Sequence, residues 1–309
     1  MTVIAPGIRF LDLRFQGSPQ VIATGVLEGP ASRVALIDPG PTSTLDELRA
    51  QLAHGGLGLG DVETILLTHI HLDHAGACGT ILREHPGITV YVHERGAPHL
   101  INPEKLLNSA TRLYGSAMDR LWGAFEPVPA ANIRALAGGE TVTAGGHTLQ
   151  TAYTPGHASH HLAYYDEPSR IAFVGDVAGV SIPPAHVIVP PTPPPDIDIE
   201  AWEASVEKVL AWQPEALFLT HFGLKSNPAI HLQELIERLR MWARLVKDLM
   251  ASEPNPDARR TKFARQVDLE LRRTVSPAEV IRYGLAVAAD QSYNGLERYW
   301  TKKAERAAK

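Results

Sequence analysis

Three histidines and one aspartate, all common metal ligands, lie within six residues of one another: His69, His71, Asp73 and His74. They follow a short apolar run, Thr64-Ile65-Leu66-Leu67, which is typical of a buried strand. Alternate side chains of an extended backbone point the same way, so His69 and His71 can bind one cation. Asp73 and His74 are adjacent and diverge, which suits a second cation beside the first. The spacing therefore predicts a site for two metal ions.

Further residues of the same kinds stand where later apolar runs end. The turn at Pro155-Gly156 presents His157, with His160 and His161 close behind it. The runs at 170–174 and 216–219 lead to Asp176 and His221. We expect His157 to be a ligand, His160 to matter much less, and His161 to face the site. Four strands would thus deliver His or Asp to a common sheet edge.

One more acidic residue, Asp38, ends the strand predicted at 33–38, next to Pro39-Gly40. Two interpretations remain open from its sequence context. Aspartate is a frequent turn former, and a carboxylate is also a frequent partner that orients a metal-bound histidine.

The remaining pattern predicts the elements that carry these residues. Strands are expected at 8–14, 20–27 and 88–93, and helices from Ser43, from Gly76 to about His85, and over 103–123. The segment from Ile182 to Ile197 holds seven prolines and is predicted to be an ordered, extended surface loop that forms a wall of the substrate pocket. His186 within it is expected to be exposed.

The C-terminal part changes character, because no strand pattern follows Ile230. An apolar face runs from Leu232 to Leu249, a second helix covers about 257–273, and a third starts after Ser276-Pro277. We therefore divide the chain into a catalytic domain, 1–228, and a helical region, 229–309. These helices should shape substrate access without supplying ligands, with aromatic residues that mostly pack them together: Tyr283, Tyr293 and Trp300.

Composition narrows the classes of function. With a formal net charge of −5 and no long run of Lys or Arg, nucleic acid is not an expected partner. No stretch approaches the length of a membrane span, and the N-terminus lacks the pattern of a signal peptide, so a cytoplasmic location is expected. The single cysteine, Cys78, is predicted to be buried in a helix. The expected partner is a small-molecule substrate; a homodimer is left open.

The segment His69-Ile70-His71-Leu72-Asp73-His74, followed in order by His157, Gly175-Asp176 and His221, resembles the motifs of the metallo-β-lactamase superfamily. The resemblance covers roughly residues 8–225. It implies an α/β (α+β) four-layer αββα sandwich, with a dinuclear site at one edge of two facing sheets and the C-terminal helices as an appendage. In the family's scheme one metal is held by His69, His71 and His157, and the other by Asp73, His74 and His221, with Asp176 bridging. Asp38 matches the family's first acidic motif.

Within this superfamily the chain is most similar to glyoxalase II-like hydrolases, whose ligand set and whose sequence around Gly156 to His161 it shares. The similarity implies hydrolysis of a small ester, thioester or lactone by a metal-bridging hydroxide, with Asp73 also orienting the water. Quorum-sensing lactonases carry a tyrosine three residues after the bridging aspartate, where this chain has Gly179.

Other functions fit the same scaffold. They are a phosphoesterase, a mononuclear iron enzyme of the persulfide dioxygenase type, and a non-catalytic scaffold. The complete second ligand set, Asp73, His74 and His221, counts against the iron enzyme, and intact ligands count against the scaffold. Histidine and carboxylate ligands without thiolates suit two divalent ions of Zn, Fe or Mn, with Zn preferred.

Overall fold

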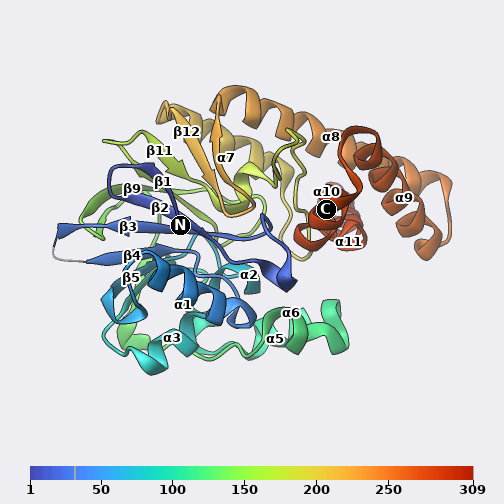
Figure 1. Cartoon of the computed structure of the whole chain (residues 1–309). Helices are drawn as coiled ribbons and strands as arrows, with labels where there is room; N and C mark the ends of the chain where they lie inside the picture. The colour runs from blue at the N-terminus through green and yellow to red at the C-terminus, as the bar shows by residue number, and fades with distance from the viewer. Residues whose placement is uncertain (31–32, 309) are drawn as a thin grey trace.

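A computed structural model of the chain describes residues 1–30 and 33–308. Two β-sheets are stacked face to face, and helices cover the outer face of each (Figure 1). Helices α1 and α3 lie below the first sheet, α7 and α8 lie above the second, and α9, α10 and α11 close one end of the stack. The αββα sandwich with C-terminal helices, predicted from the sequence, is confirmed.

The sheets are mixed in direction. The first has the order β1-β2-β3-β4-β5-β6-β7 and the second the order β13-β12-β11-β10-β9-β8. Strands β4, β5, β6 and β7 run parallel to one another, β11 and β12 run parallel to each other, and the other pairs are antiparallel. The strand bounds are β1 (Thr2–Ala5), β2 (Ile8–Asp12), β3 (Ala23–Glu28), β4 (Val34–Ile37), β5 (Val62–Leu66), β6 (Thr89–His93), β7 (Ile133–Leu136), β8 (Thr141–Ala144), β9 (His147–Tyr153), β10 (Leu162–Asp166), β11 (Ile171–Phe173), β12 (Ala216–Leu219) and β13 (Gly223–Ser226).

The helices connect the parallel strands and form the C-terminal region. Several begin with side chains suited to a helix start: Asp198 accepts the N–H of Ala201, and Ser276 with Glu279 forms a capping box before Pro277. None of the described helices is both long and apolar enough to cross a membrane. Their bounds are α1 (Leu45–His54), α2 (Leu72–Ala75), α3 (Cys78–Glu84), α4 (Ala97–Ile101), α5 (Glu104–Tyr114), α6 (Met118–Trp122), α7 (Ile199–Ala211), α8 (Pro228–Ser252), α9 (Pro256–Thr274), α10 (Pro277–Ala286) and α11 (Ala289–Ala307).

Three apolar layers hold the stack together. Side chains alternate along each strand, so Leu66 packs between the sheets while Ile65 packs against the helices below. In the second sheet, Phe218 points between the sheets and Leu217 points towards α7 and α8. Burial on both faces explains why these strands read as continuous apolar runs.

Some expectations differ from the structure. Strands β1, β10 and β13 were not predicted from the sequence. The strand pattern predicted one common sheet edge for the ligand-bearing strands, whereas the family resemblance implied a site at the edge of two facing sheets. The ligand-bearing strands belong to two sheets: β5 to the first, and β9, β11 and β12 to the second. A single strand pattern specifies neither its partner strand nor its sheet, because the pairing is set by contacts that are distant in sequence.

The proline-rich segment is largely buried, so the prediction of a surface loop was wrong in that respect, although His186 is exposed as expected. Helices α10 and α11 cover it. The buried Tyr283 accepts the N–H of Ile182 at 3.0 Å and donates to the carbonyl of Val187 at 2.6 Å. Glu279 accepts the N–H of Ala185. The polar backbone of the segment is therefore satisfied by helix side chains instead of water.

The C-terminal helices share one apolar cluster with the second sheet. It joins Val174 of the sheet region and Trp202 of α7 to Trp242 of α8, Phe263 of α9 and Tyr293 of α11. The helical region predicted from 229 onwards thus packs through a common core, and the division at 228 stays a prediction.

Replacing Tyr283 with phenylalanine should lower the free energy of unfolding by about 1 to 3 kcal/mol, because the N–H of Ile182 and the carbonyl of Val187 lose their buried partner. Urea unfolding followed by circular dichroism measures this. Tyr299→Phe is the matched control, since its hydroxyl contacts the exposed Glu200, and it should change stability by less than about 0.5 kcal/mol. Equal losses in the two variants would contradict the role given to Tyr283.

Candidate metal centre

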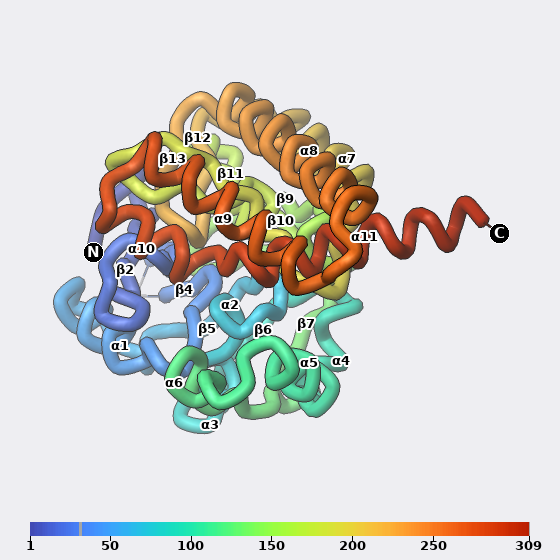
Figure 2. The backbone as a smooth tube through the Cα atoms, turned by 90° about the vertical axis from the view of Figure 1, so that its right-hand side faces the viewer, coloured from blue at the N-terminus to red at the C-terminus, as the bar shows by residue number. Residues whose placement is uncertain are grey.

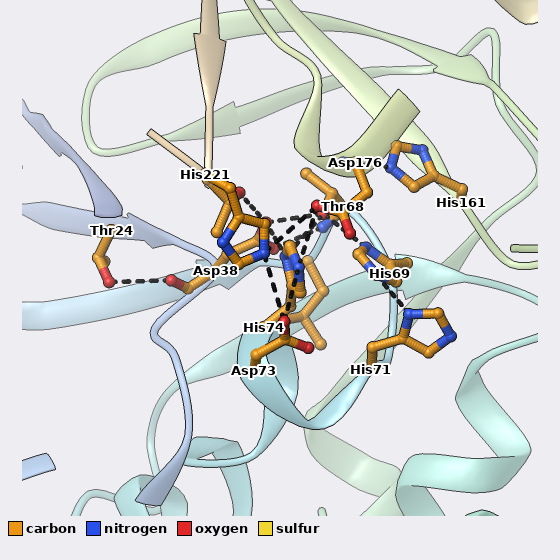
Figure 3. A network of polar contacts seen from close by, with 12 residues as sticks. Thr24, Asp38, Thr68, His69, His71, Asp73, His74, His161, Asp176 and His221 are labelled. Atoms are coloured by element: carbon orange, nitrogen blue, oxygen red, sulfur yellow. Dashed lines mark hydrogen bonds and ion pairs between the residues drawn. The ribbon is translucent and has the colours of Figure 1, made fainter. Parts of the chain in front are cut away.

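All seven predicted ligand residues meet at one end of the stacked sheets. Figure 3 labels all of them except His157. The loop after β5 carries the first histidines and leads into α2, which holds Asp73 and His74. His157 follows β9, Asp176 follows β11 and His221 follows β12. Strands β5, β11 and β12 all end at the same end of the stacked sheets. The residues that follow them therefore come together, although the strands belong to two different sheets.

The first group consists of His69, His71 and His157. The Nδ1 atom of His71 lies 3.0 Å from Nε2 of His69 and 2.9 Å from Nε2 of His157. Burial lowers the pKa of His71 to about 4, and it lowers the pKa of His69 and His157 as well. At neutral pH these imidazoles are uncharged, which is the form that binds a metal ion.

The second group consists of Asp73, His74 and His221. Oδ2 of Asp73 lies 3.3 Å from Nε2 of His221 and 3.8 Å from Nε2 of His74. Asp176 stands between the two groups: its Oδ1 is 3.3 Å from Nε2 of His74, and its Oδ2 is 3.4 Å from Nε2 of His157. The two oxygens of this carboxylate thus face different groups, as a bridging ligand requires.

Three atoms of this cluster are buried without a hydrogen-bond partner among the described residues: Nε2 of His74, Nε2 of His221 and Oδ1 of Asp176. Leaving such atoms unpaired in the interior is costly, and native proteins seldom do so. Here Oδ1 of Asp176 lies 3.3 Å from Nε2 of His74 and 3.6 Å from Nε2 of His221. A cation between them would satisfy all three at once, so the donor set fits a metal ion.

The opposite nitrogens of the histidines are held by fixed acceptors. Nδ1 of His74 donates to Asp38 at 2.7 Å, Nδ1 of His157 to the carbonyl of Pro191 at 2.8 Å, and Nδ1 of His221 to the carbonyl of Val21 at 2.7 Å. Each of these bonds directs Nε2 into the cluster and fixes the tautomer.

Asp38 is completely buried, and its carboxylate accepts more hydrogen bonds than any other side chain of the cluster. Its Oδ1 accepts the N–H of Thr68, and its Oδ2 accepts from His74 and from the hydroxyls of Thr68 and Thr220, at 2.7 to 2.8 Å. Its backbone has φ 51°, the left-handed conformation of a turn. Both interpretations left open by the sequence therefore hold: Asp38 forms the turn, and it orients His74.

The electrostatics of the second group favour ionised carboxylates. Burial alone would raise the pKa of Asp73, but His74 and His221 outweigh it and bring the pKa to about 2. Burial likewise opposes ionisation of Asp176, and the neighbouring histidines hold its pKa well below the usual value. Burial also acts on His74, yet Asp176, Asp38 and Asp73 raise its pKa well above the usual value. The cluster thus concentrates negative charge that attracts a cation.

Two histidines close behind His157, namely His160 and His161, lie outside the ligand groups found among the described residues. His161 is buried, is 2.9 Å from the hydroxyl of Thr154, and accepts the N–H of Asp176 at 3.3 Å, so it holds the Asp176 loop. His160 accepts the N–H of Ile70 at 3.4 Å and faces the cavity described below. Sequence reasoning missed Thr68 and Thr220, although each directly precedes a ligand-type histidine at a strand end. That repeated Thr-His pair was the available signal.

A cavity of about 650 Å³ opens over the cluster, and His71, Asp73, His157 and Asp176 line it. Its other walls come from α5, α6, the segment 191–196 and the junction of α10 with α11. The C-terminal helices therefore shape access to the centre, as predicted. Their large aromatic residues pack instead: Tyr293 is buried, and Trp300 donates to the carbonyl of Ala243.

Comparisons with known proteins agree with this geometry. The sequence profile of the metallo-beta-lactamase superfamily matches residues 18–221. A metallo-beta-lactamase fold-containing protein of Sulfurisphaera tokodaii is 28% identical over 185 residues, which is 58% of this chain and 69% of that protein. A hydroxyacylglutathione hydrolase of Haemophilus influenzae is 30% identical over 143 residues, 46% of this chain and 60% of that enzyme.

The same fold is found among solved structures. A metallo-beta-lactamase family protein from Thermus thermophilus has a TM-score of 0.68 with this chain at 23% identity, and the match covers 98% of this chain and 95% of that one. The family profile spans well over half of the 309 residues and includes the whole ligand-type cluster. The chain therefore belongs to the metallo-beta-lactamase superfamily and is a hydrolase of that fold.

Proposed function

We propose that this protein is a dinuclear metal-dependent hydrolase, with zinc as the preferred metal, that acts on a small ester, thioester or lactone. The observation that carries the proposal is the group of three buried, unpartnered atoms on His74, His221 and Asp176. Four further ligand-type side chains lie around them. The carboxylate of Asp176 contacts His157 with one oxygen and His74 with the other.

Each metal would have its own set of chain atoms. Nε2 of His69, Nδ1 of His71 and Nε2 of His157 would hold one ion. The carboxylate of Asp73 and the Nε2 atoms of His74 and His221 would hold the other, and Asp176 would contact both. Nitrogen and oxygen ligands suit Zn, and Fe or Mn also fit. Cys78 is buried and burial raises its pKa, so no thiolate is supplied.

When bound, two such ions supply a hydroxide at neutral pH and stabilise negative charge that develops on a carbonyl oxygen. The chain contributes the geometry around that chemistry. Asp73 is the carboxylate that the cavity reaches best: its side chain is 21% exposed, against 5% for Asp176. One of its oxygens is near His221, and the carboxylate can accept a hydrogen bond from an incoming water and so orient it for attack.

The substrate class is supported by two observations. One relative is named a hydroxyacylglutathione hydrolase, and its substrate is a thioester. The cavity is walled by the C-terminal helices and suits a small molecule. The assembled second group, Asp73 with His74 and His221, counts against a single-iron oxygenase, because that class needs only one set of ligands.

The purified full chain, prepared without chelators, should contain two divalent ions per molecule, measured by inductively coupled plasma mass spectrometry. It should hydrolyse at least one member of a panel of small esters, thioesters and lactones, and lose activity on chelation. One iron per chain with sulfur-oxidising activity would support the oxygenase instead. Activity confined to phosphodiesters would support a phosphoesterase.

Replacing Asp176 with alanine should lower kcat/KM by more than about 100-fold, because it removes the side chain shared by both groups. A loss of about 100-fold is what removal of a residue that only orients a metal ligand costs. Steady-state kinetics and metal analysis measure the two effects separately. Asp46→Ala serves as the control, since Asp46 is exposed on α1. Wild-type kinetics in Asp176→Ala would refute the bridging role.

Replacing Asp38 with asparagine should weaken binding of the metal held by His74 by about 10- to 100-fold. An amide has only one acceptor oxygen, so either Nδ1 of His74 or the N–H of Thr68 would face an NH2 group that cannot accept its hydrogen bond. Competition with a chromophoric chelator measures the affinity. Asp61→Asn changes the same groups at the exposed turn where Asp61 accepts the N–H of Gly58, and it should leave the affinity unchanged. If the two variants bind metal equally well, Asp38 does not orient His74.

A further inference from the structure

The cavity over the metal centre has an apolar end between α6, α5 and α10. Phe15 stacks on Trp122 with ring centres 5.4 Å apart, and Tyr114 meets Trp122 edge to face at 5.0 Å. Phe15 and Trp122 are only 1% and 6% exposed, so this wall is rigid and closed. Aliphatic side chains complete this end of the cavity: Leu106, Leu113, Leu121 and Leu285. Lys105 of α5 and Arg120 of α6 also line the cavity, and Arg120 donates to Gln16. The aromatic rings and the leucines are the part of this end that suits a hydrocarbon group.

The opposite end of the cavity is basic. There it adjoins a second cavity of about 680 Å³, and the two share Arg95, Ser159 and Asp196. The second cavity is also lined by Lys302, Lys303 and Arg306, all from the last turns of α11. In Figure 2, α6 and α10 lie on the left, and α4 and the second half of α11 lie on the right.

The second cavity also holds three carboxylates, and only one of them has a cationic partner. Asp196 accepts the hydroxyl of Ser159 at 2.6 Å, Asp198 caps α7 through the N–H of Ala201, and Glu200 pairs with Lys303. Within the described residues, no ion pair joins Arg95, Lys302 or Arg306 to a carboxylate. These three cations outnumber Asp196 and Asp198, so the lining keeps a net positive charge that attracts an anion.

Four ligand-type residues line the same cavity as the apolar side chains, and this cavity shares Arg95 with the basic one: His71, Asp73, His157 and Asp176. We propose that the site takes thioesters with an apolar acyl group and an anionic leaving thiol. The acyl chain lies against Phe15 and Trp122, and the anionic part reaches Arg95 and Arg306. This inference rests on the hydrolase function proposed above.

The reaction that follows is a simple hydrolysis. A water oxygen forms the new bond to the carbonyl carbon, the carbon–sulfur bond breaks, and the sulfur leaves with the electron pair and takes up a proton. An acid and a free thiol are the products, with no change in oxidation state. The anion on the thiol could be a carboxylate, as in glutathione, or a phosphate, as in coenzyme A, and both are tested below.

The experiment uses the zinc-loaded full chain and thioesters that vary in both parts. Acetyl, butanoyl and octanoyl groups are each joined to coenzyme A, to glutathione and to the uncharged thiol N-acetylcysteamine. We expect kcat/KM to rise by about threefold for each added methylene. We expect at least one anionic thiol to exceed the neutral one by about 10-fold or more, and this advantage to shrink as salt is added.

Two variants assign these effects to the two ends. Leu113→Gln should flatten the dependence on chain length, because Leu113 lines the apolar end and is half-buried. The double variant Arg95→Gln/Arg306→Gln should reduce the ratio of anionic to neutral kcat/KM by about 10-fold. The matched controls lie on the exposed surface of α9: Leu269→Gln and Arg265→Gln should keep the wild-type ratios.

A binding measurement checks the same assignment without turnover. The octyl thioether of coenzyme A and S-octylglutathione are each titrated into the protein and followed by calorimetry. The preferred thioether is the one that the wild-type protein binds more tightly, and it should bind to both variants more weakly than to both controls. The preferred thioether shows whether phosphate or carboxylate is recognised.

Two kinds of failure are distinguishable. If the protein hydrolyses these thioesters without regard to chain length or to charge, or if the variants keep the wild-type ratios, the inference about the two ends is wrong and the hydrolase function stands. If no ester, thioester or lactone is hydrolysed by the metal-loaded protein, the proposed function itself is wrong, and the inference falls with it.

Discussion

The buried carboxylate of Asp38 ties the two sheets together at the end where the ligand-type side chains gather. It accepts hydrogen bonds from Thr68, after β5 of the first sheet, from Thr220, after β12 of the second, and from His74 in α2. A completely buried carboxylate is tolerated only when its oxygens are satisfied, and here they are. The relative position of the sheets and the orientation of a ligand-type histidine therefore depend on one group.

The fixed orientation of the histidines explains why ligand-type atoms of the centre lack hydrogen-bond partners among the described residues. His74, His157 and His221 are each held from behind by a rigid acceptor, so their Nε2 atoms cannot turn away to find another bond. The fold thereby maintains a cluster of ligand-type atoms that a bound cation would satisfy. The unpaired buried atoms lower the stability of the fold locally and keep the site preformed. Functional sites often combine these two properties.

The C-terminal helices give the fold its own substrate cavity. They share an apolar core with the outer face of the second sheet, and Tyr283 and Glu279 hold the proline-rich segment in place beneath them. The segment in turn supplies the carbonyl of Pro191 to His157 and several cavity-lining prolines. Access to the centre and support of one ligand-type residue are thus built from the same contacts, which links substrate recognition to the geometry of the metal groups.

The sequence by itself determined the seven ligand-type residues, the strands that precede them and the C-terminal helices. The helix expected over about 257–273, for example, is α9 at Pro256–Thr274. These features follow from spacing and periodicity within short stretches, which act locally along the chain. Only the tertiary structure decided that the residues come from two sheets, that the proline-rich segment is buried, and that the cavity has an apolar and a basic end. Each of these depends on contacts between distant residues, such as Asp38 with Thr220, 182 positions apart. Local pattern carries no information about which distant surface will cover a segment or complete a site.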